Sequence, residues 1–400
     1  MLGSMRGRLI TAESVSTGHP DSYMDYVVNR SLDTILKEDP KARFACDGVA
    51  KNDVVYLGGE ITTSVKSLDK LLKQTVAIAT EEIGYDWEPK VKLEIAAQSP
   101  DIAMGTNDAM DTELGASDQG TQTGYACNET DEYYPLVKTL ADGIIYNLFS
   151  AYKSGEFKNV KADMKSQVTV DYSGDKPVAK TVVVACPTTE DCDQGEFQRF
   201  ITRECVRVIE KYGVDASNVR FIINGTGKFT IYGPMGDSGE VGRKIVVDAY
   251  GLHPHATVGG GTFNGKGTGH VDRIGAYGCR YVAKNIVAAG LADECRIDVA
   301  YCIGVAEPMS LYFDFYGTEK VLAERIVEKA KELFSFKPYN LREKFSITDY
   351  ATAGLVGHFG HTTKRRLFDG EEISIPWEQL DLVEGFKVLL DEFNKLMEEV

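Results

Sequence analysis

The 400-residue sequence has no excess of positive charge. Its 44 Lys and Arg residues stand against 60 Asp and Glu residues, which gives a formal net charge of −16. A protein that binds nucleic acid or an anionic membrane through its overall charge needs the opposite balance, so neither partner is expected. Any anionic substrate must instead meet a local group of cations.

Long apolar runs and paired cysteines are also lacking. No apolar run approaches the roughly 18 residues of a membrane span, and the start, MLGSMRGRLI, has no continuous apolar stretch typical of a signal peptide. The eight cysteines form no Cys-x-x-Cys pair and mostly lie in apolar runs such as VVVAC. We therefore expect buried thiols in a reducing cytoplasm rather than disulfides.

Histidine spacing does not favour a zinc site. The pairs His253-x-His255 and His358-x-x-His361 lie in segments rich in Gly or Pro, without nearby Cys or paired acids. Ordinary loop histidines are the better interpretation.

What the sequence does contain is a threefold internal repeat. Three β-like runs, VVYLGGEIT, KTVVVACPT and SLYFDFYGT, each precede an amphipathic helical pattern, and these helices begin about 126 residues apart. They are predicted over 68–83, 193–212 and 319–334, with further helices over 20–36, 133–152, 273–289 and 378–399. Each repeat therefore predicts a sheet with helices against one face, which is the α+β class.

The segment 257–273, TVGGGTFNGKGTGHVDR, nearly contains a phosphate-binding P-loop. Gly260, Gly265 and Lys266 have the required spacing, but Gly267 stands where a Ser or Thr must hold magnesium. A P-loop NTPase is therefore not favoured. The pattern favours a flexible loop that presents Lys266 to an anion, and a merely mobile surface loop is the alternative.

Further cations could complete a positive pocket. Arg243 and Lys244 follow a Gly-rich stretch, and Lys165 lies in DMKSQVTVDY. His19 and Asp21 stand at the start of the helix predicted over 20–36, where backbone N–H groups favour an anion and a carboxylate oxygen suits Mg²⁺. A simple helix-capping role for Asp21 is the alternative.

Nine stretches, in order, closely resemble the S-adenosylmethionine synthetase (methionine adenosyltransferase) family. They are ESVSTGHPD (13–21), GEIT (59–62), QSPDIA (98–103), SDQG (117–120), DMKSQVTV (163–170), GPMGDSGEVGRKIVVDAYG (233–251), GGGTFNGK (259–266), VDR (271–273) and GHFG (357–360). The similarity spans roughly residues 8–377. Nine matches in order are far more specific than any single one.

The resemblance implies an organisation that agrees with the repeat. The family has three similar sheet-plus-helix units related by a pseudo-threefold. We expect an N-terminal unit over 8–104, a central unit over 115–234, a C-terminal unit over 235–377 and a C-terminal helix over 378–400. A homodimer or homotetramer with active sites between subunits is also implied.

The resemblance also implies a reaction. The sulfur of L-methionine attacks C5′ of ATP and expels the triphosphate, which is hydrolysed to pyrophosphate and phosphate before release. A neutral thioether has no proton to remove, so catalysis should lie in alignment and in stabilising the leaving tripolyphosphate. That demand accounts for the cations and for the family cofactors Mg²⁺ and K⁺.

Site residues carry over motif by motif. His19, Lys165, Arg243, Lys244 and Lys266 would act on the phosphates as the catalytic group. The remaining ATP contacts would come from Asp163, Phe229, Asp237 and Thr262. The methionine site would contain Glu60, Gln98, Asp118, Asp237, His270 and Ile303, and the metals would be held by Asp21 and Asp272 for Mg²⁺ and by Asp47 for K⁺. The family loop between QSPDIA and DQG acts as a lid and matches the long segment 99–117.

The chain departs from the family pattern mainly around the amino acid and the lid. Family GHPDK has Ser22 here, and the Glu that binds K⁺ is replaced by the shorter Asp47, which puts K⁺ dependence in doubt. Other departures are Thr121, Gln122 and Thr123 after the lid, Tyr232 near Phe229, and Thr262, Gly267 and His270 in the Gly-rich loop.

His270 stands where the family has a Lys that helps bind the methionine carboxylate. An unperturbed imidazole titrates near about 6.5, so methionine affinity is expected to fall between about pH 6 and 8. The alternative is that His270 points away from the substrate.

Three functions remain open from the sequence. The first is a working synthetase that uses ATP and methionine. The second is a weakened paralogue that binds nucleotide or serves as a regulatory subunit, although a binding module needs no tripolyphosphate site. The third is a synthetase with an altered amino-acid substrate.

Overall fold

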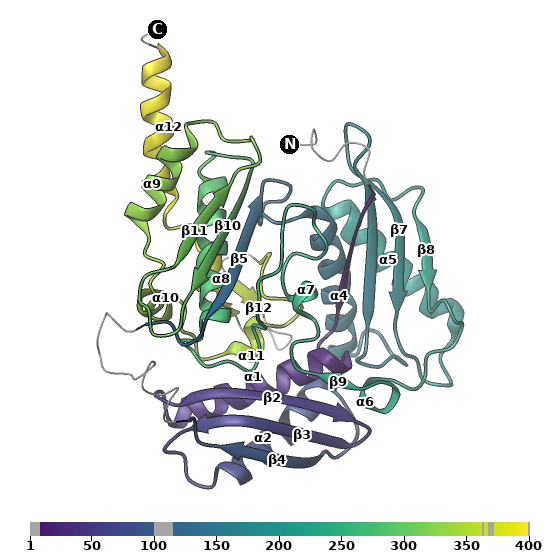
Figure 1. Ribbon diagram of the computed structural model, residues 1–400. Coiled ribbons are helices and arrows are strands. Elements are labelled where there is room, and N and C mark those ends of the chain that lie inside the picture. The colour runs from purple at the N-terminus through teal and green to yellow at the C-terminus, as the bar shows by residue number, and fades with distance from the viewer. Residues whose placement is uncertain (1–8, 100–114, 362–363, 367–371, 399–400) are drawn as a thin grey trace.

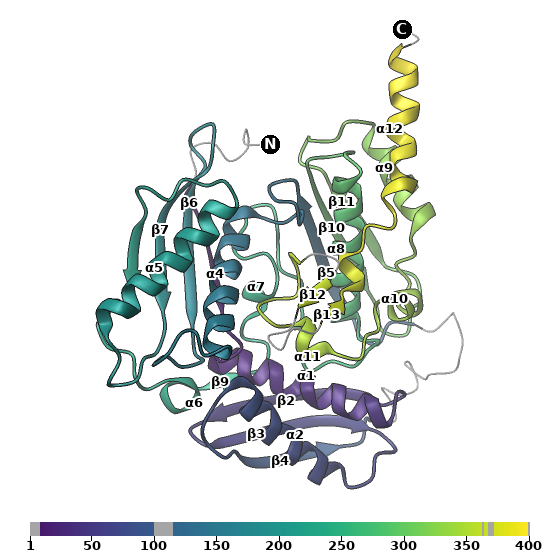
Figure 2. The same ribbon diagram turned by 180° about the vertical axis from the view of Figure 1, so that it is seen from behind.

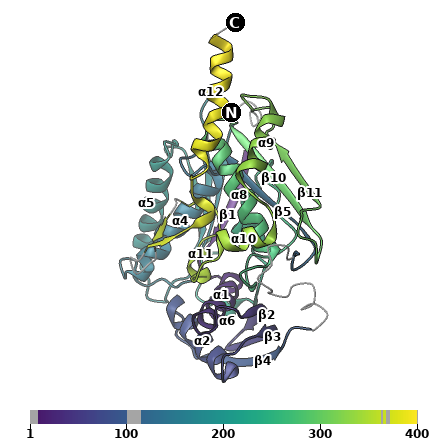
Figure 3. The same ribbon diagram turned by 90° about the vertical axis from the view of Figure 1, so that its left-hand side faces the viewer.

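The computed structural model describes residues 9–99, 115–361, 364–366 and 372–398. Within these residues the strands form three larger sheets, together with a short ladder of β12 (Lys364–Arg366) and β13 (Glu372–Ser374). Figures 1 and 2 show the three sheets toward one side of the molecule and the long helices toward the other, and Figure 3 shows this division edge-on.

The first two sheets share one plan. Sheet 1 has the order β4 (Lys90–Ala96), β3 (Val54–Thr62), β2 (Arg43–Lys51) and β9 (Gly239–Glu240). Sheet 2 has the order β8 (Arg220–Ile223), β7 (Val178–Ala185), β6 (Lys165–Asp171) and β1 (Leu9–Val15). In each, an antiparallel hairpin is followed by a helix and a parallel strand.

The third sheet repeats the hairpin without the final strand. Its order is β11 (Ser310–Asp314), β10 (Glu294–Tyr301) and β5 (Gly120–Cys127). The helices after the three hairpins are α2 (Leu68–Ile83), α5 (Gln194–Lys211) and α9 (Ala323–Leu333). This arrangement confirms the predicted α+β class with three similar sheet-plus-helix units.

Each sheet receives its edge strand from another unit. The strand β1 pairs with β6, β5 pairs with β10, and β9 pairs with β2, always antiparallel. The units therefore exchange strands in a cycle, and each exchange covers a sheet edge that would otherwise be open. Segments expected as consecutive units are thus interleaved in space, since each of the three larger sheets takes a strand from a second stretch of chain.

Three long helices begin after the exchanged strands. They are α1 (Pro20–Glu38), α4 (Leu136–Lys153) and α8 (Val271–Ala288). Each packs on a sheet other than the one that its preceding exchanged strand joins: α1 on sheet 1 beside β9, α4 on sheet 2 beside β1, and α8 on sheet 3 beside β5. Buried residues at three- and four-residue spacing, such as Met24, Val27 and Val28, form the inner face of α1. The sequence predicted these helices from that spacing.

The C-terminal part adds short elements and one protruding helix. The short helices are α6 (Gly233–Gly236), α7 (Ile245–Asp248), α10 (Pro338–Phe345), α11 (Tyr350–Ala353) and the 3₁₀ turn η2 (Pro376–Glu378). The last helix, α12 (Val383–Glu398), extends away from the body in all three views.

Two predicted helix starts were wrong by four or more residues, and the helix expected from 133 begins at Leu136, after Pro135. The helix expected from 319 begins at Ala323, because the Lys320 N–H binds the Leu291 carbonyl at 2.8 Å and ties the chain down first. The helix expected from 378 begins at Val383. Glu378 instead ends η2 and is fully buried.

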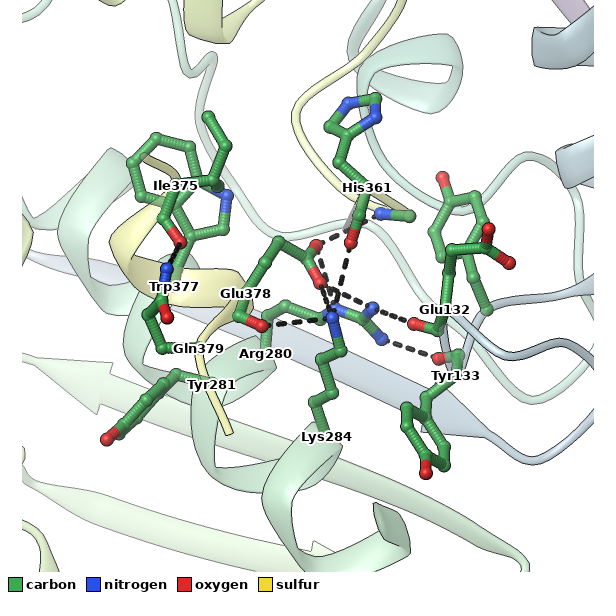
Figure 4. Close-up of polar contacts among 12 residues, drawn as sticks. Glu132, Tyr133, Arg280, Tyr281, Lys284, His361, Ile375, Trp377, Glu378 and Gln379 are labelled. Atoms are coloured by element: carbon green, nitrogen blue, oxygen red, sulfur yellow. Dashed lines mark hydrogen bonds and ion pairs between the residues drawn. The ribbon is translucent and has the colours of Figure 1, made fainter. Parts of the chain in front are cut away.

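Glu378 lies at the centre of a buried ion cluster (Figure 4). Its Oε2 accepts from Arg280 Nη2 at 2.9 Å and from Lys284 Nζ at 2.6 Å. Arg280 also donates to the carbonyls of Tyr125, Tyr133 and Glu132. One buried carboxylate therefore holds η2 against α8, and through Arg280 against the β5–α4 connection.

Candidate active site

The first candidate cluster lies at the start of α1. His19 is the N-cap, and its Nδ1 accepts the Asp21 N–H at 3.2 Å. A neutral imidazole with Nδ1 as acceptor carries its proton on Nε2. Burial, followed by the charges of Lys244 and Lys165, lowers the pKa of His19 to about 3. His19 is therefore neutral near pH 7 and has an N–H to donate.

Asp21 is buried at the same helix start. Its Oδ1 accepts the Glu240 N–H at 3.0 Å, and its Oδ2 meets Lys244 Nζ at 2.6 Å. Arg243 Nη1 lies 3.8 Å from Oδ1. The backbone of β9 thus orients the Asp21 carboxylate through one oxygen, while the flexible Lys244 ammonium pairs with the other oxygen.

Asp163 and Lys165 extend this cluster. Asp163 Oδ2 accepts the Gly233 N–H at 2.9 Å, and burial raises the pKa of Asp163 to about 6 although Gly233 and Lys165 oppose the shift. Lys165 opens β6 opposite Val15. The charge of Asp237 acts on His19 and on Asp163, which places it beside the same group.

The second cluster, at the start of α8, repeats the first. His270 is the N-cap, and its Nδ1 accepts the Asp272 N–H at 3.3 Å. Lys266 Nζ lies 3.3 Å from Asp272 Oδ2. A His-x-Asp sequence with a Lys against the Asp therefore recurs at equivalent helix starts of two units. The third equivalent helix, α4, begins after Pro135 and lacks it.

Gln122 was not expected to be a hydrogen-bond partner of Asp272. Its Nε2 donates to Asp272 Oδ1 at 3.0 Å, and the side chain is buried. The sequence marked Gln122 only as a departure from the family pattern. Its role follows from the strand exchange, which carries β5 beneath α8, and no local spacing signals that.

His270 does not have the ordinary pKa assumed from the sequence. Burial, followed by the positive charge of Lys266, lowers its pKa to about 4. The imidazole is therefore neutral throughout the range from about pH 6 to 8. A change in methionine affinity over this range is no longer expected from His270.

The Gly-rich loop joins the two clusters. A Cβ at Gly261 would lie 2.2 Å from Asp272 Oδ2, so only glycine lets the loop backbone approach this carboxylate. The Thr262 side chain lies 2.9 Å from where a Cβ of Gly242 would be, next to Arg243. Thr262 Oγ1 also accepts the Asn264 N–H at 3.1 Å. The loop thus lies against the segment that carries Arg243 and Lys244.

Predicted methionine and K⁺ residues lie near Lys266 on sheet 1. Ala45 pairs with Glu60 on β3 and forms a bridge with Lys266 on its other side. Asp47, two residues along β2, faces the same way and is exposed. The charge of Asp118 acts on His270, which places it beside the second cluster.

Three predicted residues are not joined to either cluster by contacts among the described residues. Gln98 donates its backbone N–H to Thr62 Oγ1 at 3.0 Å, while its buried Oε1 has no partner. Ile303 bridges to Ala116 and is 44% exposed. Phe229 is half-buried. Most of the predicted lid, residues 100–114, lies outside the described residues.

Asp21 and Asp272 fit Mg²⁺ only together with a substrate. No three His, Cys, Asp or Glu side chains gather to hold a metal in the described ranges. Mg²⁺ commonly uses one or two carboxylates together with phosphate oxygens. In each cluster one carboxylate oxygen is fixed and the other meets only a lysine or histidine nitrogen, so a metal with a phosphate could replace the ammonium.

Comparisons with known proteins cover nearly the whole chain. Models of S-adenosylmethionine synthetase match with the N-terminal domain at residues 7–106, the central domain at 113–229 and the C-terminal domain at 231–379. A solved S-adenosylmethionine synthetase from Campylobacter jejuni, described as unusual, is 30% identical with a TM-score of 0.83. The match covers 96% of this chain and 99% of that one.

Proposed function

The chain belongs to the S-adenosylmethionine synthetase family and is a methionine adenosyltransferase, and from this premise we propose that it makes S-adenosylmethionine from ATP and L-methionine. The products would be S-adenosylmethionine, pyrophosphate and phosphate, with tripolyphosphate as the intermediate. The observation that carries this proposal is the duplicated His-x-Asp and Lys arrangement at the starts of α1 and α8.

This arrangement suits a reaction whose difficulty lies in the leaving group. The methionine sulfur attacks C5′ with its own lone pair, and the electrons of the broken C5′–O bond remain on the triphosphate. Groups that meet this developing charge lower the barrier because they are already oriented. Lys165, Arg243, Lys244 and Lys266 would supply positive charge, and neutral His19 would donate its Nε2–H to an oxygen near the broken bond.

The lysine–aspartate pairs support a role in receiving the triphosphate. Lys244 and Lys266 each pair with a carboxylate, at 2.6 Å and 3.3 Å, so each aspartate has a counter-charge. Both ammonium groups could turn to phosphate oxygens when ATP binds. Mg²⁺ held by Asp21 and Asp272 would then add charge stabilisation for the polyphosphate.

The methionine side of the site would be built from residues near Lys266. Glu60, Asp118 and Asp237 carry negative charge suited to the amino group, while Gln98, Ile303 and His270 would line the rest. Asp47 would hold K⁺, with weaker K⁺ activation than a Glu because its carboxylate is one methylene shorter. Asp163, Phe229 and Thr262 would complete the ATP site.

A homodimer or homotetramer with active sites between subunits is part of the proposal. The outer faces of the three sheets lie toward one side of the molecule (Figures 1 and 3). Val49 and Tyr56 are cross-strand partners on sheet 1 and are 40% and 38% exposed. Exposed apolar sheet surface of this kind suits a second copy.

We place the protein in the cytoplasm, without nucleic-acid or membrane partners. All eight cysteines are free thiols. Within the described ranges, no helix combines the length and the apolar character that spanning a bilayer demands.

Product analysis across several sulfur amino acids tests the proposal. The protein is incubated with ATP, Mg²⁺, K⁺ and either methionine, ethionine or homocysteine, and the adenosylated product is measured by mass. Methionine should give the highest kcat/KM. A higher kcat/KM for another of these sulfur amino acids would favour the altered-substrate alternative, and nucleotide binding without any product would favour the regulatory paralogue.

A further inference from the structure

A small polar cavity lies beside α1, where it meets α7 and the segment that follows α11. Its volume is about 20 Å³, which is enough for one water molecule or one small ion. Its lining includes six polar side chains from segments far apart in the sequence: Thr17, Ser22, Asp25, Asn29, Asp248 and Asn264.

Two of these side chains are buried carboxylates. Asp25 is 6% exposed and Asp248 is 5% exposed, and no residue in the described part of the chain forms an ion pair with either. Asp25 Oδ1 accepts the Gly242 N–H at 2.8 Å, and Asp248 Oδ2 accepts from Asn264 Nδ2 at 2.9 Å. Burying two such charges without a counter-ion is costly.

Two oxygens of the lining have no hydrogen-bond partner among the residues that the structure describes. They are Asp25 Oδ2 and Thr17 Oγ1, and Thr17 is only 4% exposed. Carboxylate and hydroxyl oxygens are the ligands that hard cations prefer. The nearby ammonium groups are engaged elsewhere, because Lys244 pairs with Asp21 and Lys138 pairs with Asp142.

The raised pKa values of Asp25 and Asp248 are consistent with a site that lacks a positive charge. Burial, followed by the neighbouring Asp248 carboxylate, raises the pKa of Asp25 well above its usual range. Burial also raises the pKa of Asp248 to about 7 although Lys138 opposes the shift. Without a cation, this pair must retain a proton that ordinary aspartates lose.

Ser22 shows where such a charge could have stood. It lines the cavity three residues before Asp25, and residues at this spacing are neighbours on a helix surface. This chain offers only a hydroxyl at position 22. A lysine there could extend its ammonium toward the carboxylates.

We propose that this cavity binds one small monovalent cation through oxygens of Asp25, Asp248 and Thr17. The cation supplies the single positive charge that a lysine at position 22 would carry. This site is distinct from the K⁺ position at Asp47, which is exposed on sheet 1. It adjoins the cluster at the start of α1, since Asp25 accepts the N–H of Gly242 next to Arg243. Its role is to stabilise the contact of α1 with α7 and the segment after α11.

Thermal unfolding of the full chain tests the proposal. Choline chloride is replaced by NaCl, KCl or NH₄Cl at constant ionic strength, with a chelator present and at about pH 8 so that protons compete little. At least one cation should raise the unfolding midpoint by about 2 °C or more, because a ligand that binds only the folded state stabilises it. An equal midpoint in every salt contradicts the proposal.

Three variants identify the site. Ser22→Lys should raise the midpoint in choline and remove the cation response, whereas Ser22→Met, of similar length but uncharged, should retain the response. Asp47→Ala should also retain it. Loss of the response in Asp47→Ala together with its persistence in Ser22→Lys would place the ion on sheet 1 and overturn the proposal.

Crystals of the unmutated protein grown with Tl⁺ give a direct readout that does not depend on folding of variants. An anomalous peak between Asp25, Asp248 and Thr17 is expected. Absence of a peak there, with a peak at Asp47 in the same crystal, would contradict the site.

Discussion

Single side chains at the two helix starts define the proposed chemistry. Lys244 and Lys266 each face a carboxylate whose other oxygen is fixed, by a backbone N–H for Asp21 and by Gln122 for Asp272. The protein itself therefore fixes the orientation of these charges, which is the condition under which electrostatic catalysis is most effective.

Lys266→Ala should reduce turnover by about 100-fold or more, because the leaving polyphosphate loses a preorganised charge in a partly buried site. Lys266→Arg keeps the charge and should retain more activity. Steady-state kcat at saturating ATP and methionine is the measurement. Near-normal kcat in Lys266→Ala would show that this lysine does not act on the phosphates.

Several residues proposed for the site from the sequence lie together in the structure, but the sequence did not predict their electrostatic state. His19, Asp21, Lys244, Lys266 and Asp272 fall into two clusters because motifs at helix starts fix local geometry. The low pKa of His270 could not be predicted, because it depends on burial under other parts of the chain. The same holds for Gln122, which reaches Asp272 from an exchanged strand.

At the scale of elements, the Glu378 cluster holds the C-terminal segment against α8 (Figure 4). Glu378→Gln should lower stability by about 3–5 kcal/mol, because Arg280 and Lys284 would remain buried without a full counter-charge. Glu384→Gln is a matched control on α12, since its pair with Lys387 at 2.7 Å is exposed and should matter by less than about 1 kcal/mol. Denaturant unfolding compares the variants, and equal losses would contradict the role of Glu378.

The same cluster predicts a pH dependence. Burial alone would raise the pKa of Glu378, but Arg280 and Lys284 outweigh it and hold that pKa below its usual value. A carboxylate with a lowered folded-state pKa stabilises above its ordinary pKa of about 4.3, and this contribution is lost as pH falls through the folded value. The difference in unfolding midpoint between the parent and Glu378→Gln should therefore shrink below about pH 4. A difference that stays constant well below pH 4 would exclude the ion pairs as its source.

The bounds of a helix could be predicted where apolar residues recur at helical spacing along one continuous segment. The spacing of Leu72, Val76 and Ala79 gave the bounds of α2 as the structure has them. The late starts of α9 and α12 depend on contacts with distant segments, namely Leu291 for Lys320 and Arg280 for Glu378. Local pattern contains no information on these contacts.

At the scale of the whole molecule, the cyclic exchange of β1, β5 and β9 binds the three units into one body. The period of the repeat predicted three units, but it could not predict the exchange, because each exchanged strand pairs with a partner more than a hundred residues away. The exchange also brings β5 under α8 and β9 beside α1, so it builds both clusters.

Tyr56→Asp should weaken self-association if the outer face of sheet 1 contacts a second copy. A buried charge opposed to an apolar surface is costly, so a shift toward monomer and a loss of activity should occur together. Ile78→Asp, at an exposed position on α2, is the control. Sedimentation velocity measures the mass, and an unchanged oligomer in Tyr56→Asp would remove this face from the interface.

The most direct test of the central claim follows every part of ATP in a single turnover. Enzyme in excess is mixed with methionine, Mg²⁺ and ATP labelled separately in the adenosyl group and in the γ-phosphate, and the reaction is quenched over time. Each S-adenosylmethionine that takes up the adenosyl label should be matched by one phosphate and one pyrophosphate, with the γ label recovered in these two products and no ADP formed. Formation of ADP, or release of phosphate without an adenosylated product, would contradict it.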